Sequence, residues 1–89
     1  MAYKILLHPK ASEFLKKKER IIRERIKNKL RVLKNLPGRK GNHLRYTPFW
    51  KLRIGDYRAV YEINNKEKKV IVLFIGHRKN VYDEFSKLL

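Results

Sequence analysis

The spacing of the hydrophobic residues changes once along this chain, and that change most constrains how the chain can fold. Between residues 14 and 33, apolar side chains recur every three or four positions, as on an amphipathic helix. From residue 44 onward they recur every second position, as in strands with one buried face. Pro37 and Gly38 separate the two patterns, at the start of a predicted loop over residues 37–42. Because 89 residues can build only one core, we expect a single α+β domain over the whole chain, residues 1–89.

The first half of the chain is expected to hold one strand and a pair of helices. A strand is predicted over residues 3–8, where alternate side chains are apolar and Pro9 stops the ladder. Ser12 is the expected N-cap of a short first helix. A break near residues 17–20 separates it from a longer helix that reaches about Asn35.

The second half is predicted to form a small antiparallel sheet, with the helical pair packed on one face. Three strands are expected, at residues 49–54, 57–64 and 69–76. Gly55-Asp56 suits a two-residue hairpin turn, since glycine supplies the positive φ that such turns need. Residues 70–75 are apolar at every position, which indicates a strand buried on both faces. A short closing helix is predicted over residues 80–89, with the apolar residues Val81, Phe85, Leu88 and Leu89. The expected order is β-α-α-β-β-β, with this short C-terminal helix after it.

One feature of the predicted hairpin conflicts with stability. The two-residue turn pairs Arg53 with Arg58 and places Lys51 on the same face, although like charges across a ladder are unfavourable. Such conflicts are expected at functional sites. Arg78 follows directly after the buried strand, and Tyr82 comes four residues later. We therefore predict a concave anion site that binds phosphate, because guanidinium groups match phosphate oxygens in pairs. The alternative is a surface on which both arginines extend into water.

The charge of the chain limits its partners. Lysine and arginine number 24 against 8 acidic residues, for a formal charge of +16 and a pI of about 10.4. This charge favours either a nucleic acid or an acidic protein as partner, and does not separate the two. There is no cysteine, the three histidines lack metal-ligand spacing, and the carboxylates are scattered, so we expect no metal and no cofactor. No apolar run approaches the length of a membrane span, and we expect a cytoplasmic protein without a membrane partner.

Four segments together resemble the RelE-type toxins of the RelE/ParE toxin–antitoxin superfamily: Leu44-Arg45, residues 50–62, residues 75–78 and Val81-Tyr82. The resemblance implies ribosome-dependent endonucleolytic cleavage of mRNA. It also implies neutralisation by an acidic RelB-type antitoxin in a hetero-oligomer. The residues that match substrate-binding and catalytic positions of the family are Lys51, Arg53, Arg58, Arg78 and Tyr82. Further RNA contacts are expected from Arg45, His77 and Lys79.

The chain departs from this pattern at one position. Some relatives have lysine where Arg53 stands, and arginine cannot release its proton in a protein. We expect a metal-independent reaction in which the 2′-hydroxyl attacks the adjacent phosphate, with Lys51 or Tyr82 as base. The surrounding positive charge is expected to lower the pKa of Tyr82.

Three other functions remain open from the sequence. A ParE-like toxin that inhibits DNA gyrase would share the fold, although that subgroup generally lacks the basic and tyrosine set. A non-catalytic RNA-binding domain would use shape and phosphate contacts. A degenerate toxin would keep only its binding partners, and Arg53 leaves that reading open.

Overall fold

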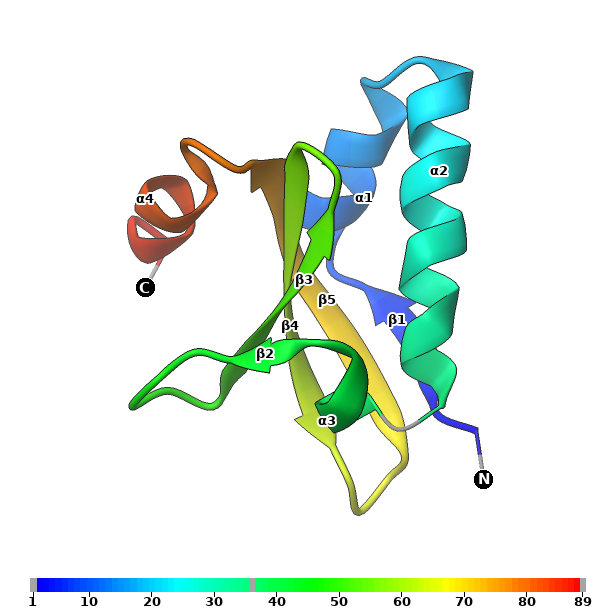
Figure 1. The fold of residues 1–89 in the computed structure, drawn as a ribbon, viewed down its shortest axis with the longest axis vertical. Helices are drawn as coiled ribbons and strands as arrows, with labels where there is room; N and C mark the ends of the chain where they lie inside the picture. The colour runs from blue at the N-terminus through cyan, green and yellow to red at the C-terminus, as the bar shows by residue number, and fades with distance from the viewer. Residues whose placement is uncertain (1, 36, 89) are drawn as a thin grey trace.

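The computed structural model describes residues 2–35 and 37–88, which form an open five-stranded sheet with helices on both faces (Figure 1). The strand order is β1-β5-β4-β3-β2. The strands are β1 (Lys4–Leu7), β2 (Asn42–His43), β3 (Phe49–Ile54), β4 (Tyr57–Asn64) and β5 (Lys69–His77). The helices are α1 (Pro9–Lys16), α2 (Arg20–Leu30), the 3-10 helix η1 (Arg31–Lys34), α3 (Pro37–Lys40) and α4 (Val81–Ser86). The α+β class is confirmed.

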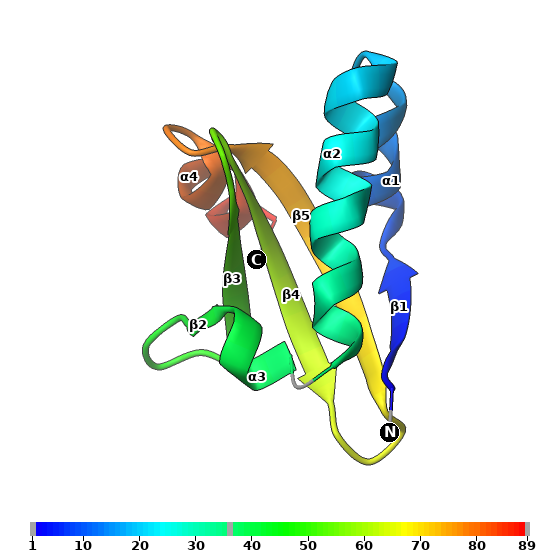
Figure 2. The same cartoon turned by 45° about the vertical axis from the view of Figure 1, so that its right-hand side comes forward.

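The two faces of the sheet are covered by different helices. The helices α1 and α2 lie on one face and α4 lies on the other (Figure 2). Ala11, Leu15, Ile26 and Leu30 of the helical pair are buried against strand residues that include Leu52. A smaller core forms under α4, where the buried residues are Val60, Val81 and Phe85. The sheet therefore lies between a layer formed by α1 and α2 on one face and the short C-terminal helix α4 on the other.

The register of the β3–β4 hairpin is the predicted one. Gly55 has φ +57°, and Ile54 pairs with Tyr57 at the turn. Arg53 then pairs with Arg58. Strand β5 is buried from both faces, as expected, and a register shift opposite Val60/Tyr61 leaves Leu73 as the extra residue.

Two details of the first half differ from the prediction. Strand β1 pairs with β5 in parallel, so the sheet is mixed rather than wholly antiparallel. Alternation does not indicate strand direction, and the long connection from β1 to its partner allows a parallel pair. Ser12 is not an N-cap: α1 begins at Pro9, and the side chain of His8 accepts a hydrogen bond of 3.1 Å from the backbone N of Lys10. Proline at the first helical position has no N–H to leave unpaired.

The segment between the helical pair and the hairpin is also more structured than predicted. Helix α2 ends at Leu30, and a tighter 3-10 turn continues it to Lys34. Residues 37–42, predicted as a loop, contain α3 and the start of β2. The closing helix is present, although Leu89 lies outside the described residues. Across residues 2–35 and 37–88, the helices are too short or too polar to cross a membrane.

Candidate nucleic-acid interface

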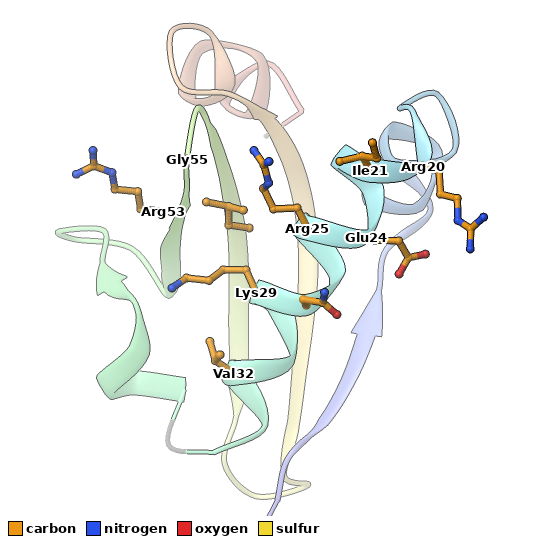
Figure 3. A pocket seen from close by; sticks show the side chains of 10 residues that line it. Arg20, Ile21, Glu24, Arg25, Lys29, Val32, Arg53 and Gly55 are labelled. Carbon is orange, nitrogen blue, oxygen red and sulfur yellow. The ribbon is translucent and has the colours of Figure 1, made fainter.

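The β3–β4 hairpin places three cationic side chains on the face away from α1 and α2. Leu52 and Ile54 of β3 are each 3% exposed and pack under the helical pair. Because side chains alternate along a strand, Lys51 and Arg53 point to the opposite face. Figure 3 shows Arg53 extending away from α2. Arg58 lies directly across the ladder from Arg53, so the core residues of the hairpin determine where these cations lie.

The hairpin turn holds two of the arginines. Nη1 of Arg58 donates hydrogen bonds of 2.7 Å to the carbonyl oxygens of Gly55 and Tyr57. The backbone N of Arg78 donates to the carbonyl oxygen of Asp56 at 2.8 Å. Nε of Arg78 also lies 3.8 Å from a carboxylate oxygen of Asp56. The turn thus brings the end of β5 next to the β3–β4 hairpin.

Helix α4 brings Tyr82 to the same face. Val81 and Phe85 bury the inner side of α4. Gly76 allows this close approach, because a Cβ there would lie 3.1 Å from the Cβ of Val81. The ring centroid of Tyr82 is 5.9 Å from Nζ of Lys51, within the range of a cation–π contact. An aromatic ring from α4 and an amine from β3 therefore meet over the hairpin.

The protonation of Tyr82 differs from the sequence-based expectation. Burial raises the pKa of Tyr82, and the nearby charge of Arg58 only partly offsets this rise. Although Tyr82 is 37% exposed, its loss of hydration outweighs the positive charge of Arg58. The expectation of a lowered pKa is wrong. Tyr82 keeps its proton at neutral pH and is suited to donating a hydrogen bond or to stacking.

The remaining predicted RNA contacts come from outside the β3–β4 hairpin. His77 pairs with Tyr57, and their ring centroids are 6.1 Å apart on the face toward α1. Lys79 follows in an exposed turn, and its backbone N donates to Nδ1 of His77 at 3.2 Å. Arg45 lies in the loop between β2 and β3. The structure therefore groups Lys51, Arg53, Arg58, Arg78 and Tyr82 around the hairpin and places His77 on the other face.

A separate groove of about 1080 Å³ runs between α2 and the end of β3. Figure 3 shows Arg25 and Lys29 extending from α2 toward β3. Ile21, which is 73% exposed, contributes apolar surface. The other residues that line the groove include Val32, Arg53 and Ile54. Sequence reasoning missed this groove, to which α2 contributes Ile21 and the following 3-10 helix contributes Val32. It is distinct from the predicted anion site, which it touches only at Arg53.

Comparison with known proteins agrees with this fold. A family model described as the ParE toxin of type II toxin–antitoxin systems, parDE, matches residues 5–82. The toxin–antitoxin complex RelBE2 of Mycobacterium tuberculosis contains a chain that is 26% identical, with a TM-score of 0.80 over 88% of this chain and 100% of that chain. A free mutant of Escherichia coli toxin RelE is 31% identical, with a TM-score of 0.80 over 100% of this chain and 99% of that one. The RelE–RelB complex of Pyrococcus horikoshii gives 25% identity and a TM-score of 0.74 over 88% of this chain and 97% of that chain. No curated protein sequence matches the chain.

The family match covers most of the chain, and the structural matches extend over nearly all of it. The chain belongs to the ParE toxin family of type II toxin–antitoxin systems, within the RelE/ParE superfamily. It is a toxin whose structure resembles RelE.

Proposed function

We propose that this toxin is an endoribonuclease that cuts mRNA on the ribosome. The observation that carries the proposal is the gathering of Lys51, Arg53 and Arg58 on one hairpin face, beside the phenol of Tyr82. Among the side chains that the structure describes, ion pairs join Lys17 to Glu13, Lys69 to Glu67 and Arg78 to Asp56, so no carboxylate among them pairs with the hairpin cations. Uncompensated cations on a shared face favour a phosphate backbone.

The proposed reaction uses the RNA as its own nucleophile. The 2′-oxygen attacks the adjacent phosphorus while its proton passes to a base, and the bond from phosphorus to the 5′-oxygen breaks. The leaving 5′-oxygen takes up a proton from the phenol of Tyr82, which is protonated at neutral pH. The products are a 2′,3′-cyclic phosphate and a 5′-hydroxyl end. Charge builds up on the phosphorane oxygens, and positioned cations stabilise that charge.

Each side chain then has one role. Tyr82 holds its proton at neutral pH, so we assign the role of base to Lys51, whose Nζ lies beside the Tyr82 ring. Arg53 and Arg58 stabilise the phosphorane, and each such contact is worth on the order of a hundredfold in rate. Arg78, at the end of β5, binds the phosphate near the leaving oxygen. Proton transfer by a positioned base contributes roughly 10²–10⁴-fold.

We propose that the ribosome is required because the site is open: the protein fixes its own side chains but does not position a flexible RNA. Arg58 is tied to the turn and Lys51 to the ring of Tyr82, yet Arg53 is exposed. A flexible message must therefore be aligned by something else before in-line attack can occur, and alignment of this kind lowers the barrier strongly.

The test is cleavage of message on programmed ribosomes. Cut sites are mapped for the native toxin, Arg58→Ala, Arg78→Ala and a control, Lys66→Ala, which removes an exposed charge from the β4–β5 turn. We expect cuts from the native toxin and the control, and a loss of at least tenfold in both arginine variants. Undiminished cutting by both folded variants would refute the assignment. Gyrase supercoiling is measured in the same extract, and inhibition there without cleavage would support the ParE-like alternative.

We further propose that an acidic RelB-type antitoxin binds this chain as a hetero-oligomer, as RelB binds RelE in the E. coli and P. horikoshii complexes. The α2–β3 groove suits an acidic amphipathic segment, because Arg25 and Lys29 line it together with the exposed Ile21. Arg25→Glu should weaken the antitoxin complex at least tenfold in a titration that follows toxin inhibition. Lys66→Glu, with the same change of charge outside the groove, should not. Equal weakening by both would show attraction by net charge alone.

A further inference from the structure

The loop between β2 and β3 presents the aromatic ring of Tyr46 to solvent. Tyr46 is 94% exposed, more than any other large hydrophobic residue in the described part of the chain. Its backbone has φ +65°, a conformation that bulky residues rarely adopt. Folding gains nothing from a ring that buries no surface, and glycine would suit this backbone better. Tyr46 thus conflicts with stability at a site where no core contact explains it.

The loop is nevertheless held in one shape. The backbone N of Leu44 donates to the carbonyl oxygen of Phe49 at 2.9 Å, and the backbone N of Thr47 donates to the carbonyl oxygen of Leu44 at 3.2 Å. The hydroxyl of Thr47 donates to the same oxygen at 2.7 Å and accepts from the backbone N of Phe49 at 3.1 Å. Nε2 of His43 lies 2.5 Å from the carbonyl oxygen of Thr47. A ring on such a braced loop loses little conformational freedom when a ligand stacks on it.

The cationic side chain of Arg45 lies next to the ring of Tyr46. The guanidinium carbon of Arg45 lies 6.0 Å from the ring centroid of Tyr46. Because Tyr46 is almost fully exposed, most of the ring remains open to a flat partner. Aromatic rings together with arginine form the surfaces on which unpaired bases of single-stranded nucleic acid stack.

The loop also lies on the side of the sheet that carries the proposed site. Figures 1 and 2 both show it projecting on the same side as α4. Leu44 and Phe49, which flank the loop, pack in the small core with Val81 and Phe85 of α4. Strand β3 continues directly from the loop to Lys51, which by strand geometry lies about 10 Å beyond Pro48. A single strand of RNA at the hairpin could therefore also reach the loop.

We propose that Tyr46 stacks on an unpaired RNA base beside the catalytic group, with Arg45 binding the neighbouring phosphate. The inference rests on the proposed function, because it takes RNA as the ligand. The base belongs either to the message or to an exposed position of ribosomal RNA, and both offer the same chemistry.

Two binding measurements separate these sources. The first uses fluorescence anisotropy with a single-stranded 2′-O-methyl oligoribonucleotide, which lacks the attacking hydroxyl. The second uses ribosomes without message. We expect Tyr46→Gly to weaken one of the two roughly five- to a hundredfold, as for the loss of one stacked base. Tyr46→Trp should bind at least as tightly as the native toxin. Weakening with the oligonucleotide assigns the base to the message, and weakening with empty ribosomes assigns it to ribosomal RNA.

Controls keep the inference separate from the proposed function. Tyr46→Gly should fold at least as well as the native chain, so a weaker complex cannot be blamed on unfolding. Lys66→Gly, also in an exposed turn, should leave both affinities within twofold. If the native toxin binds and cuts but Tyr46→Gly binds both RNAs normally, the stacking role is wrong and the proposed function stands. If the native toxin binds neither RNA, both are wrong.

Discussion

Arg53 and Arg58 face each other directly across the β3–β4 ladder. Their repulsion should cost stability, so Arg53→Thr is expected to raise the free energy of unfolding by about 0.5 kcal/mol. Threonine is also well suited to a strand. The same change should lower cleavage on ribosomes by about a hundredfold, since one phosphorane contact is lost. Denaturant titration and cut-site mapping measure the two effects.

The control for this change is Lys66→Thr, which removes an exposed cation from the β4–β5 turn. It should change both quantities little, because exposed charges far from the hairpin contribute weakly. If Arg53→Thr destabilised the protein and left cleavage intact, the pair would be structural and the assignment to RNA would be wrong.

The turn of the β3–β4 hairpin made its pairing predictable from the sequence. Once Gly55-Asp56 is taken as a two-residue turn, the pairing of Arg53 with Arg58 and the face of Lys51 are determined. The residues of the candidate site could therefore be chosen from sequence. The pKa of Tyr82 could not, because its desolvation depends on how α4 packs.

Two other features were not predicted from the sequence for similar reasons. The direction of β1 relative to β5 depends on the path of the chain through α1 and α2, and the alternation of residues in β1 does not encode that path. The positive φ of Tyr46 is set by hydrogen bonds around Thr47, and nothing in the residue type of Tyr46 predicts it. Tertiary contacts decided both features.

The raised pKa of Tyr82 predicts how cleavage depends on pH. Because the phenol stays protonated below pH 10, Tyr82→Phe should lower the rate while leaving the shape of the pH–rate profile between pH 6 and 9 unchanged. If Tyr82 were the base, one limb of that profile would disappear in the variant. Arg58→Ala should raise the pKa of Tyr82 further, since it removes a positive charge that lowers it. Ultraviolet titration of tyrosinate, with Tyr82→Phe subtracted, measures that change.

Gly41 is predicted to be essential for the position of Lys51. A Cβ at residue 41 would lie 2.5 Å from the carbonyl oxygen of Lys51 and even closer to the hydroxyl of Tyr61. The carbonyl belongs to the β2–β3 ladder, where the backbone cannot yield without loss of pairing. Gly41→Ala should therefore lower the free energy of unfolding by about 1–3 kcal/mol and reduce cleavage.

Gly38→Ala is the matched control for this change. A Cβ there would make an ordinary contact of 3.5 Å with the ring of Trp50. Gly38 lies within α3, where alanine is the better helix former. The free energy of unfolding of Gly38→Ala should equal or exceed that of the native chain. A similar loss in both variants would mean that the segment is sensitive to any side chain and that contact with Lys51 is not the cause.

Tyr61 should make stability fall at alkaline pH. Burial raises its pKa from 10.0 to about 12, and its hydroxyl donates a 2.8 Å hydrogen bond to the carbonyl oxygen of Pro37. Below pH 10 both folded and unfolded chains keep this proton, and the contribution of Tyr61 is complete. Between pH 10 and about 12 the unfolded chain releases the proton while the folded chain retains it, so about 2 kcal/mol of folding stability is lost.

Lysines titrate in the same range, so the informative quantity is the difference in unfolding free energy between the native chain and Tyr61→Phe. Near pH 7 the native chain should be more stable by about 1 kcal/mol, from the hydrogen bond. The difference should shrink and then reverse sign above pH 10, and a difference that stayed constant to pH 12 would show that Tyr61 ionises normally in the folded protein.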